Sequence, residues 1–371
     1  MRRPPDFSPP IPPAVPPDGG AAPAVTLSGL GWATATLVCW TVTPLLVKYL
    51  TGVFDLWASN GWRYGMAALM WLPFLLWTIA KGKLPAGIWR RALWPAVFSA
   101  AAQVAFVGSF YFTGAGMVTF GLRFQIVATA IGACLFFPSE RAIVRRPLFL
   151  IGGGAVIAGV IGVASLATPE AAGDITPISG STAASPDRHT LGIVLAIVAG
   201  IGYACYGMAV RKCLAGVSAR LSFSVISIYV GAAMILLMVL FADAPVAQLA
   251  AIDGTQWFYL ILSVIFGLAA GHVIYFTAMT KLGVAPATGF VQLQPFTVAG
   301  AGYFVLGEVL NLRQIACGAV AVAGAGVMLY TQHAVSRRQR IDRMRTLDTL
   351  PVNEAVAMEE AELAGEEKRE S

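Results

Sequence analysis

Charged side chains are scarce in this chain of 371 residues. Asp, Glu, Lys and Arg together make up 12% of the sequence, whereas soluble domains carry about 25%. Hydrophobic residues make up 57%, and the mean hydropathy is +0.72. A chain this apolar cannot cover its surface with polar groups, so the composition excludes an ordinary soluble domain and favours a protein embedded in lipid.

Motifs for catalysis and nucleotide binding are also missing. The sequence has no G-x-x-x-x-G-K-[ST], no H-E-x-x-H, and no G-x-S-x-G between a strand and a helix. The five cysteines form no C-x-x-C pair, which argues against a metal or redox centre. We therefore expect no enzyme activity, no cofactor and no ATP-driven step. The net charge of +6 does not indicate nucleic acid, because the basic residues lie mainly between apolar segments.

Long apolar segments are what the sequence has in abundance. Ten of them are each about long enough to cross a hydrocarbon core of about 30 Å as a helix. A barrel would need alternating polar and apolar residues, so the predicted fold class is an all-α integral membrane protein of about ten transmembrane helices. The predicted spans are residues 29–49, 57–79, 92–114, 117–137, 147–167, 191–212, 221–242, 257–280, 285–306 and 312–332.

The polar segments divide the chain into five parts. Residues 1–26 are rich in proline and are predicted to be a disordered cytoplasmic tail. Residues 27–167 and 191–332 are predicted five-helix repeats, and 168–190 an outside loop between them. Residues 333–371 form a predicted cytoplasmic tail that is first basic and then acidic.

The charges between the spans predict the orientation. Basic residues gather in alternate loops, and the opposite loops carry mostly Asp and Glu, which by the positive-inside rule places both termini in the cytoplasm. We predict a protein of the bacterial inner membrane. The basic residues are Lys81, Lys83, Arg90, Arg91, Arg141, Arg145, Arg146, Arg211, Lys212, Arg220 and Lys281.

Weak internal matches indicate a duplicated unit. Tyr111-Phe112-Thr113 of the third span resembles Tyr275-Phe276-Thr277 of the eighth, and Glu140 and Glu308 follow the fourth and ninth spans. A repeat with five helices must insert its second copy upside down. Inverted repeats are common in secondary transporters, whose substrates bind between the halves.

In this order and spacing the motifs resemble the EamA family of the drug/metabolite transporter superfamily. The resemblance covers residues 29–332 and implies ten helices in an inverted repeat, with export or exchange of small metabolites, often amino acids. The long loop between the halves and Arg123 depart from the family pattern. The residues that carry the resemblance are Trp40 to Lys48, Arg63, Phe136 to Arg141, Tyr275 to Ala278, Gln294-Pro295, Leu306-Gly307-Glu308 and Gly318 to Gly326.

Arg123 is the first candidate for substrate binding, because a charge within a span costs about 2.5–3.5 kcal/mol on insertion scales. An arginine in a cavity would attract a carboxylate. Snorkelling to the outer headgroups and hydrogen bonds to helix carbonyls are equally good explanations. Arg63 and Lys48 lie near the same face and are predicted to join Arg123 in a positive vestibule, although anchoring explains Arg63 and snorkelling explains Lys48 at least as well.

His272 is the only histidine within an apolar span, so it is the natural candidate for proton coupling, although a neutral histidine bonded to a neighbouring helix is the more ordinary explanation. Gln292 and Gln294 are about 200° apart on one helix and are predicted not to face the same cavity. Gln294 is favoured because Pro295 bends the helix there, and Gln103 and Gln125 are weaker candidates. The predicted site also includes Trp40, Tyr111, Tyr203, Tyr206 and Tyr275, for which packing is the competing role.

The sequence thus predicts a secondary transporter, and more specifically an exporter, that moves an amino acid or related organic acid by alternating access. A sugar-linked or lipid-linked anion is the alternative substrate. A membrane sensor or scaffold that signals through its C-terminal tail is the alternative from another class. A homodimer and coupling to protons are left open.

Overall fold

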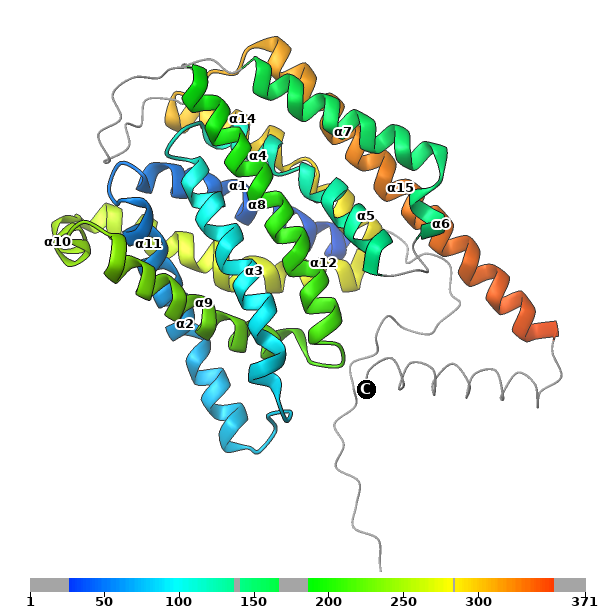
Figure 1. The fold of residues 1–371 in the computed structure, drawn as a ribbon, viewed down its shortest axis with the longest axis horizontal. Coiled ribbons are helices and arrows are strands. Elements are labelled where there is room, and N and C mark those ends of the chain that lie inside the picture. Colours follow the sequence, from blue (N-terminus) through cyan, green and yellow to red (C-terminus); the bar gives the residue numbers. More distant parts are fainter. Residues whose placement is uncertain (1–26, 137–140, 167–185, 283, 350–371) are drawn as a thin grey trace, which may run out of the picture.

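The computed structural model describes residues 27–136, 141–166, 186–282 and 284–349, and these residues form helices and the turns between them. The proline-rich tail, most of the predicted outside loop, Glu140 and the acidic tail lie outside the described residues. Figure 1 shows the arrangement of the helices.

The described residues confirm the predicted all-helical membrane fold. Eight of the segments are long and apolar enough to cross a membrane; α2 and the α13–α14 pair fall short of that measure but lie within the bundle. The helices of the first half are α1 Leu27–Leu50, α2 Leu56–Ala80, α3 Ile88–Ser109, α4 Ala115–Gly121, α5 Phe124–Phe136, α6 Arg141–Val144 and α7 Pro147–Ser165. Those of the second half are α8 Pro186–Cys213, α9 Ala219–Phe241, α10 Pro245–Ala251, α11 Gly254–Val264, the π-helix η3 Ile265–Ala269, α12 Ala270–Leu282, α13 Val284–Val291, α14 Gln294–Leu306 and α15 Leu312–Thr349.

Several boundaries differ from the predicted ones. The fourth span is divided into α4 and α5, the ninth into α13 and α14, and the eighth contains η3. Helix α15 continues to residue 349, well into the segment predicted as a tail, and α8 begins inside the predicted outside loop. Hydropathy marks where a helix leaves the lipid, not where its backbone hydrogen bonds stop, which explains both extensions.

Capping residues and a glycine explain where several of the helices begin or end. Asp55 caps α2 by accepting hydrogen bonds from the amides of Trp57 and Ala58. Asp253 and Gln256 form a capping box at the start of α11. Gly307 ends α14 with a φ of 64°, a left-handed conformation that favours glycine.

The helix contacts follow the pattern expected of two related halves. The first span packs against the eighth (α1 on α12), and its counterpart, the sixth, packs against the third (α8 on α3). The second and seventh spans pair with each other (α2 on α9), as do the fifth and tenth (α7 on α15). Exchanging the two halves therefore reproduces the same set of contacts, as a pseudo-twofold relation requires.

Helices α7 and α15 lie side by side (Figure 1) and touch through glycines. A Cβ added to Gly324 would lie 2.5 Å from the carbonyl oxygen of Gly152, and one added to Gly159 would lie 2.5 Å from the amide nitrogen of Ala321. Only glycine permits such an approach. The fifth and tenth spans therefore pack against each other within one chain.

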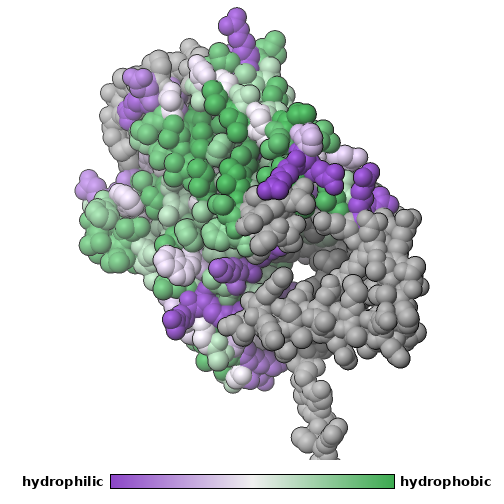
Figure 2. All heavy atoms as spheres, turned by 45° about the vertical axis from the view of Figure 1, so that its right-hand side comes forward, coloured by the Kyte–Doolittle hydropathy of each residue, from purple (hydrophilic) through white to green (hydrophobic). Residues whose placement is uncertain are grey.

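The surface is apolar where lipid would cover it. Figure 2 shows a broad hydrophobic face, with hydrophilic side chains gathered at its margins. Exposed large hydrophobic residues include Phe304, Val305, Val239 and Leu240. In water such a face would be an aggregation site, whereas in a bilayer it is the expected exterior.

Candidate functional site: a cavity between two broken helices

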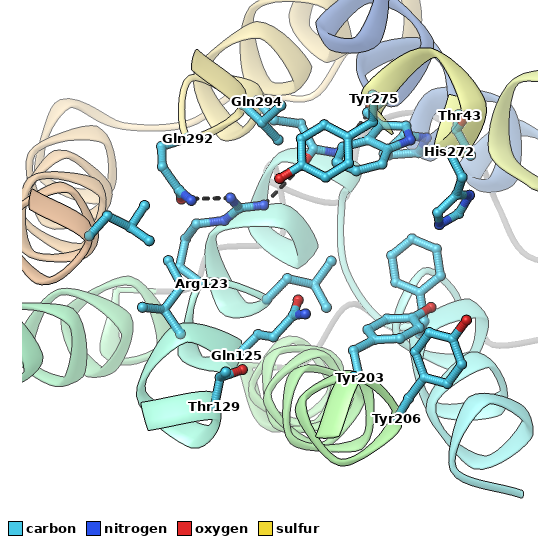
Figure 3. A pocket seen from close by; sticks show the side chains of 18 of the residues that line it. Thr43, Arg123, Gln125, Thr129, Tyr203, Tyr206, His272, Tyr275, Gln292 and Gln294 are labelled. Carbon is cyan, nitrogen blue, oxygen red and sulfur yellow. Dashed lines mark hydrogen bonds between the residues drawn. The ribbon is translucent and has the colours of Figure 1, made fainter. Parts of the chain in front are cut away.

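The fourth and ninth spans, which are counterparts in the two halves, are each interrupted by a short turn. The turn between α4 and α5 is Leu122-Arg123, and the turn between α13 and α14 is Gln292-Leu293. Pro295 is at the beginning of α14 and cannot donate a backbone hydrogen bond to the preceding turn, which explains the second break. Arg123 from the first break and Gln292 from the second point towards each other (Figure 3).

A cavity of about 480 Å³ lies beside these breaks. Its walls come from both halves, including α1, α3, α5, α8, η3, α12 and α15. Pockets of this size hold small molecules. Unwound backbone next to a cavity between two halves is also where transporters place their substrates.

Arg123 spans the gap between the two breaks. Its side chain is 9% exposed. Nη1 donates to Oε1 of Gln292 at 2.8 Å, Nη2 donates to Oε1 of Gln294 at 2.9 Å, and Nε donates to the carbonyl of Thr119 at 3.3 Å. Arg123 therefore does not snorkel to the headgroups. The guanidinium faces the cavity and joins the first half of the chain to the second.

The prediction that Gln292 and Gln294 cannot face the same cavity is wrong. It assumed a continuous helix, in which the two side chains would diverge by about 200°. The break at Gln292-Leu293 removes that constraint, and both side chains line the cavity and accept from Arg123. Gln294 is also fixed from behind, because its Nε2 donates to the carbonyl of Trp40 at 2.7 Å.

Aromatic residues line much of the rest of the cavity, with Tyr275 directed towards Arg123 and with Tyr203 and Tyr206 on the far side (Figure 3). The ring of Trp40 lies 4.9 Å from that of Tyr275 and 5.7 Å from that of His272, measured between centroids. Tyr203 and Tyr206 face the same space from α8. The structure thus brings together seven of the eight residues predicted to bind substrate: Arg123, Trp40, Tyr203, Tyr206, His272, Tyr275 and Gln294.

Tyr111 is the residue that the structure places elsewhere. Its side chain is buried away from the cavity, and its hydroxyl donates to the carbonyl of Phe54 at 2.7 Å. Tyr111 follows the end of α3, whereas its sequence counterpart Tyr275 lies within α12. The two tyrosines therefore occupy different depths in the bundle.

Comparison with known proteins agrees with this architecture. Residues 190–330, from the start of the second half to the middle of α15, match the EamA-like transporter family. This part of the chain is an EamA-like transporter domain. That family is one of membrane transporters, and the described residues contain eight candidate spans, so the chain is an integral membrane protein with an EamA-like domain in its second half.

The comparison of folds extends over both halves. One protein of known crystal structure aligns with 83% of this chain and with 98% of its own, with a TM-score of 0.53 and 14% sequence identity. At that identity the likeness concerns the fold alone. A search of the curated proteins finds no match to the sequence.

Arg63 reaches the EamA-like domain from α2 and also lines the cavity. Its side chain is 1% exposed, and Nε donates to the Ser263 hydroxyl on α11 at 3.0 Å. Lys48 does not join it. The prediction that Lys48, Arg63 and Arg123 form one positive vestibule is thus wrong for Lys48. The two arginines line the cavity, and the lysine is packed elsewhere.

Lys48 belongs instead to what we term the closed end of the bundle, formed by Lys48, Phe54, Phe110 and Glu308, all at most 1% exposed. Lys48 Nζ donates to the carbonyls of Phe110 and Thr113 at 2.9 and 3.2 Å, so it is buried and not snorkelling. A long lysine stem reaches water only if no element covers it, and here the turn after α3 covers it.

Glu308 ties the EamA-like domain to the first half at this closed end. Its carboxylate accepts from the amides of Ala115 and Gly116, at 2.6 and 3.0 Å, at the start of α4. Burial raises the pKa of the Glu308 carboxyl, while these two amides and the charge of Lys48 act in the opposite direction. A carboxylate at the N-terminus of a helix also interacts favourably with the helix dipole.

The other end of the bundle is hollow. The cavity extends to what we term the hollow end, formed by Phe149 in the first turn of α7 and by Met328, Leu329 and Gln332 of α15. The closed end lies where α15 begins, and the hollow end lies towards its far side. The cavity in the described structure therefore extends away from the closed end and towards the other end of the bundle.

Several cavity residues carry a weak signal in the sequence or none. Gln103 and Gln125 were weak candidates, and Thr43, Thr129, Gly267 and Leu268 were not proposed; all line the cavity. Gly267 and Leu268 lie within η3, and π-helical turns frequently accompany functional sites. Nothing in the local sequence distinguishes such a turn from a regular helix.

Proposed function

We propose that this transporter moves a small carboxylate-bearing metabolite by alternating access, with the cavity beside Arg123 as its binding site. The observation that carries the proposal is the position of Arg123, which is buried between the two halves without an acidic partner among the described cavity residues. A guanidinium has five N–H donors, and the protein uses three of them. Two donors remain for a ligand, in the fork geometry that suits a carboxylate.

The arrangement also supports a mechanism. Arg123 sits on the first half, whereas Gln292 and Gln294 sit on the second, so movement of one half relative to the other changes the contacts of the guanidinium. An anion bound to Arg123 would compete with the two glutamines and bias the halves towards a different arrangement, as a ligand with differential affinity must do. The fully packed closed end and the excavated hollow end support a state that is open to one side only.

We further propose that both termini lie in the cytoplasm, because the loops on that side carry the basic residues. The hollow end then faces the cytoplasm and the closed end faces outwards. A cavity that loads from the cytoplasm fits an exporter. The five-helix repeats at 27–167 and 191–332 are the two units proposed to rock against each other.

Counterflow in proteoliposomes tests the proposal. Vesicles would be loaded in turn with unlabelled amino acids, organic acids, sugars and nucleosides, and uptake of the labelled counterpart measured for the wild type and for Arg123→Gln. We expect exchange of a carboxylate-bearing solute that the variant loses. Arg313→Gln is the matched control, because Arg313 is exposed at the start of α15 and away from the cavity. Exchange retained in Arg123→Gln would remove Arg123 from the site, and exchange of sugars or nucleosides alone would overturn the substrate class.

A further inference from the structure

The described charged side chains that line the cavity are all positive. Among the described residues that line it, Arg63 and Arg123 carry full positive charge and none is Asp or Glu. An amino acid would bring an ammonium group as well as a carboxylate. That ammonium would find no carboxylate in the cavity and two guanidinium groups to repel it, which disfavours a zwitterion.

Arg63 is held so that part of its guanidinium stays available. Ser263 fixes Nε at 3.0 Å, whereas Nη1 is buried with no hydrogen-bond partner. A buried charged donor that lacks a partner is costly, by about 1–3 kcal/mol or more. Such a cost is accepted at sites where a ligand completes the hydrogen bonding.

The surroundings of Arg63 point it into the cavity. Its Nη2 lies 3.6 Å from the Cβ position of Gly267, the cavity residue within η3, so the guanidinium reaches the η3 wall of the cavity. His272, one turn further along on α12, has an Nδ1 that also lacks a hydrogen-bond partner. Arg63 on α2 and His272 on α12 thus each have a polar atom without a hydrogen-bond partner, and both side chains line the cavity.

We propose that Arg63 forms a second anion subsite, so that the transported solute is a small organic dianion with one acidic group on Arg123 and the other on Arg63. The proposal rests on the proposed transport function and narrows its substrate class from amino acids and organic acids to dianions. A volume of about 480 Å³ accommodates such a molecule. The aromatic rings and neutral amides between the two arginines would contact its uncharged backbone.

Counterflow with chain-length pairs tests the second subsite. Labelled succinate, glutarate and adipate would be compared with butanoate, pentanoate and hexanoate, and with alanine as the zwitterion. We expect the wild type to exchange at least one dicarboxylate about tenfold faster than its monocarboxylate partner, the effect of one additional charge-assisted contact. Alanine should exchange most slowly.

Variants assign the preference to Arg63. Arg63→Gln should collapse the dicarboxylate-to-monocarboxylate ratio towards one, and Arg63→Lys should retain part of it because the charge remains without the fork geometry. Arg313→Gln should leave the ratio unchanged. Thermal melting in detergent identifies any Arg63 variant that does not fold. In that case the dicarboxylate-to-monocarboxylate ratio of the wild type still tests whether the protein prefers dianions.

The outcomes separate the two proposals. A wild type without preference for dicarboxylates, or a preference that survives in a folded Arg63→Gln, would overturn the second subsite while leaving transport of carboxylates standing. No exchange of any carboxylate by folded protein would overturn the transport proposal and the subsite with it.

Discussion

The closed end and the cavity wall differ in how their buried ionisable side chains are hydrogen-bonded. At the closed end Lys48 donates to two carbonyls and Glu308 accepts from two amides, so the charges have partners within the protein. Along the cavity, Nη1 of Arg63 and Nδ1 of His272 have none. Satisfied polar groups rigidify a structure. The contrast concerns ionisable side chains alone, because hydroxyls such as that of Thr113, next to the closed end, also lack a partner.

Removing the Glu308 carboxylate should cause the largest effect. Glu308→Ala leaves the two amides of α4 without an acceptor and Lys48 without its neighbouring charge, and we expect the free energy of unfolding to fall by about 3 kcal/mol. Denaturant titration of the protein in detergent measures this. Glu308→Gln keeps one acceptor oxygen and should lose less. Equal losses in both variants would show that the charge, rather than the acceptor, matters.

A glycine-to-alanine substitution at the closed end and another along the cavity should differ in their effect on stability. Gly302→Ala at the closed end would place a Cβ 2.9 Å from Oε2 of Glu308, and such overpacking costs about 1–3 kcal/mol. Gly207 lines the cavity and has nothing within 4 Å of its Cβ position. Gly207→Ala should be neutral or stabilise α8 by about 0.5 kcal/mol. Melting temperatures that fall equally in both variants would contradict the contrast between the ends.

The two glutamines should differ in their effect on transport. Gln294→Leu removes the acceptor for Arg123 and the bond to the Trp40 carbonyl, whereas Gln292→Leu removes the acceptor alone. We expect counterflow to fall about tenfold in the first variant and about threefold in the second, since each lost bond to a charged group costs of order 1 kcal/mol. The reverse order would mean that Trp40 is positioned by other contacts.

Deleting residues 350–371 should have the smallest effect. A transporter works through its spans, so counterflow should match that of the full chain within experimental error. A scaffold that signals through its C-terminal tail would show the opposite pattern. Loss of exchange in a truncated protein that melts normally would therefore restore weight to the sensor alternative.

The sequence predicted the helices well and the breaks poorly. Apolar segments of about 20 residues locate spans because lipid demands them, and the resemblance predicted the family. Pro295 is a sequence signal for the break before α14. The turn Leu122-Arg123 between α4 and α5 contains neither proline nor glycine. That break is a property of the tertiary packing. The error over Gln292 and Gln294 follows directly from treating the ninth span as continuous.

Candidate side chains were easier to find than their surroundings. Arg123, His272 and Gln294 stood out because polar groups are costly within lipid. The same reasoning placed Lys48 at the lipid headgroups, since the sequence does not reveal that the turn after α3 covers it. Tyr111 was included through its match with Tyr275, but a repeat match carries no information on depth in the bundle.

The glycine contact between α7 and α15 restricts how these two helices can move relative to each other. A Cβ at Gly324 would lie 2.5 Å from the carbonyl oxygen of Gly152, so the two backbones are too close for either helix to slide freely along the other. Phe149 and Met328, from these two helices, both line the cavity. We expect the contact between α7 and α15 to act as the axis about which the two repeats rock, so that the opposite wall of the cavity moves most.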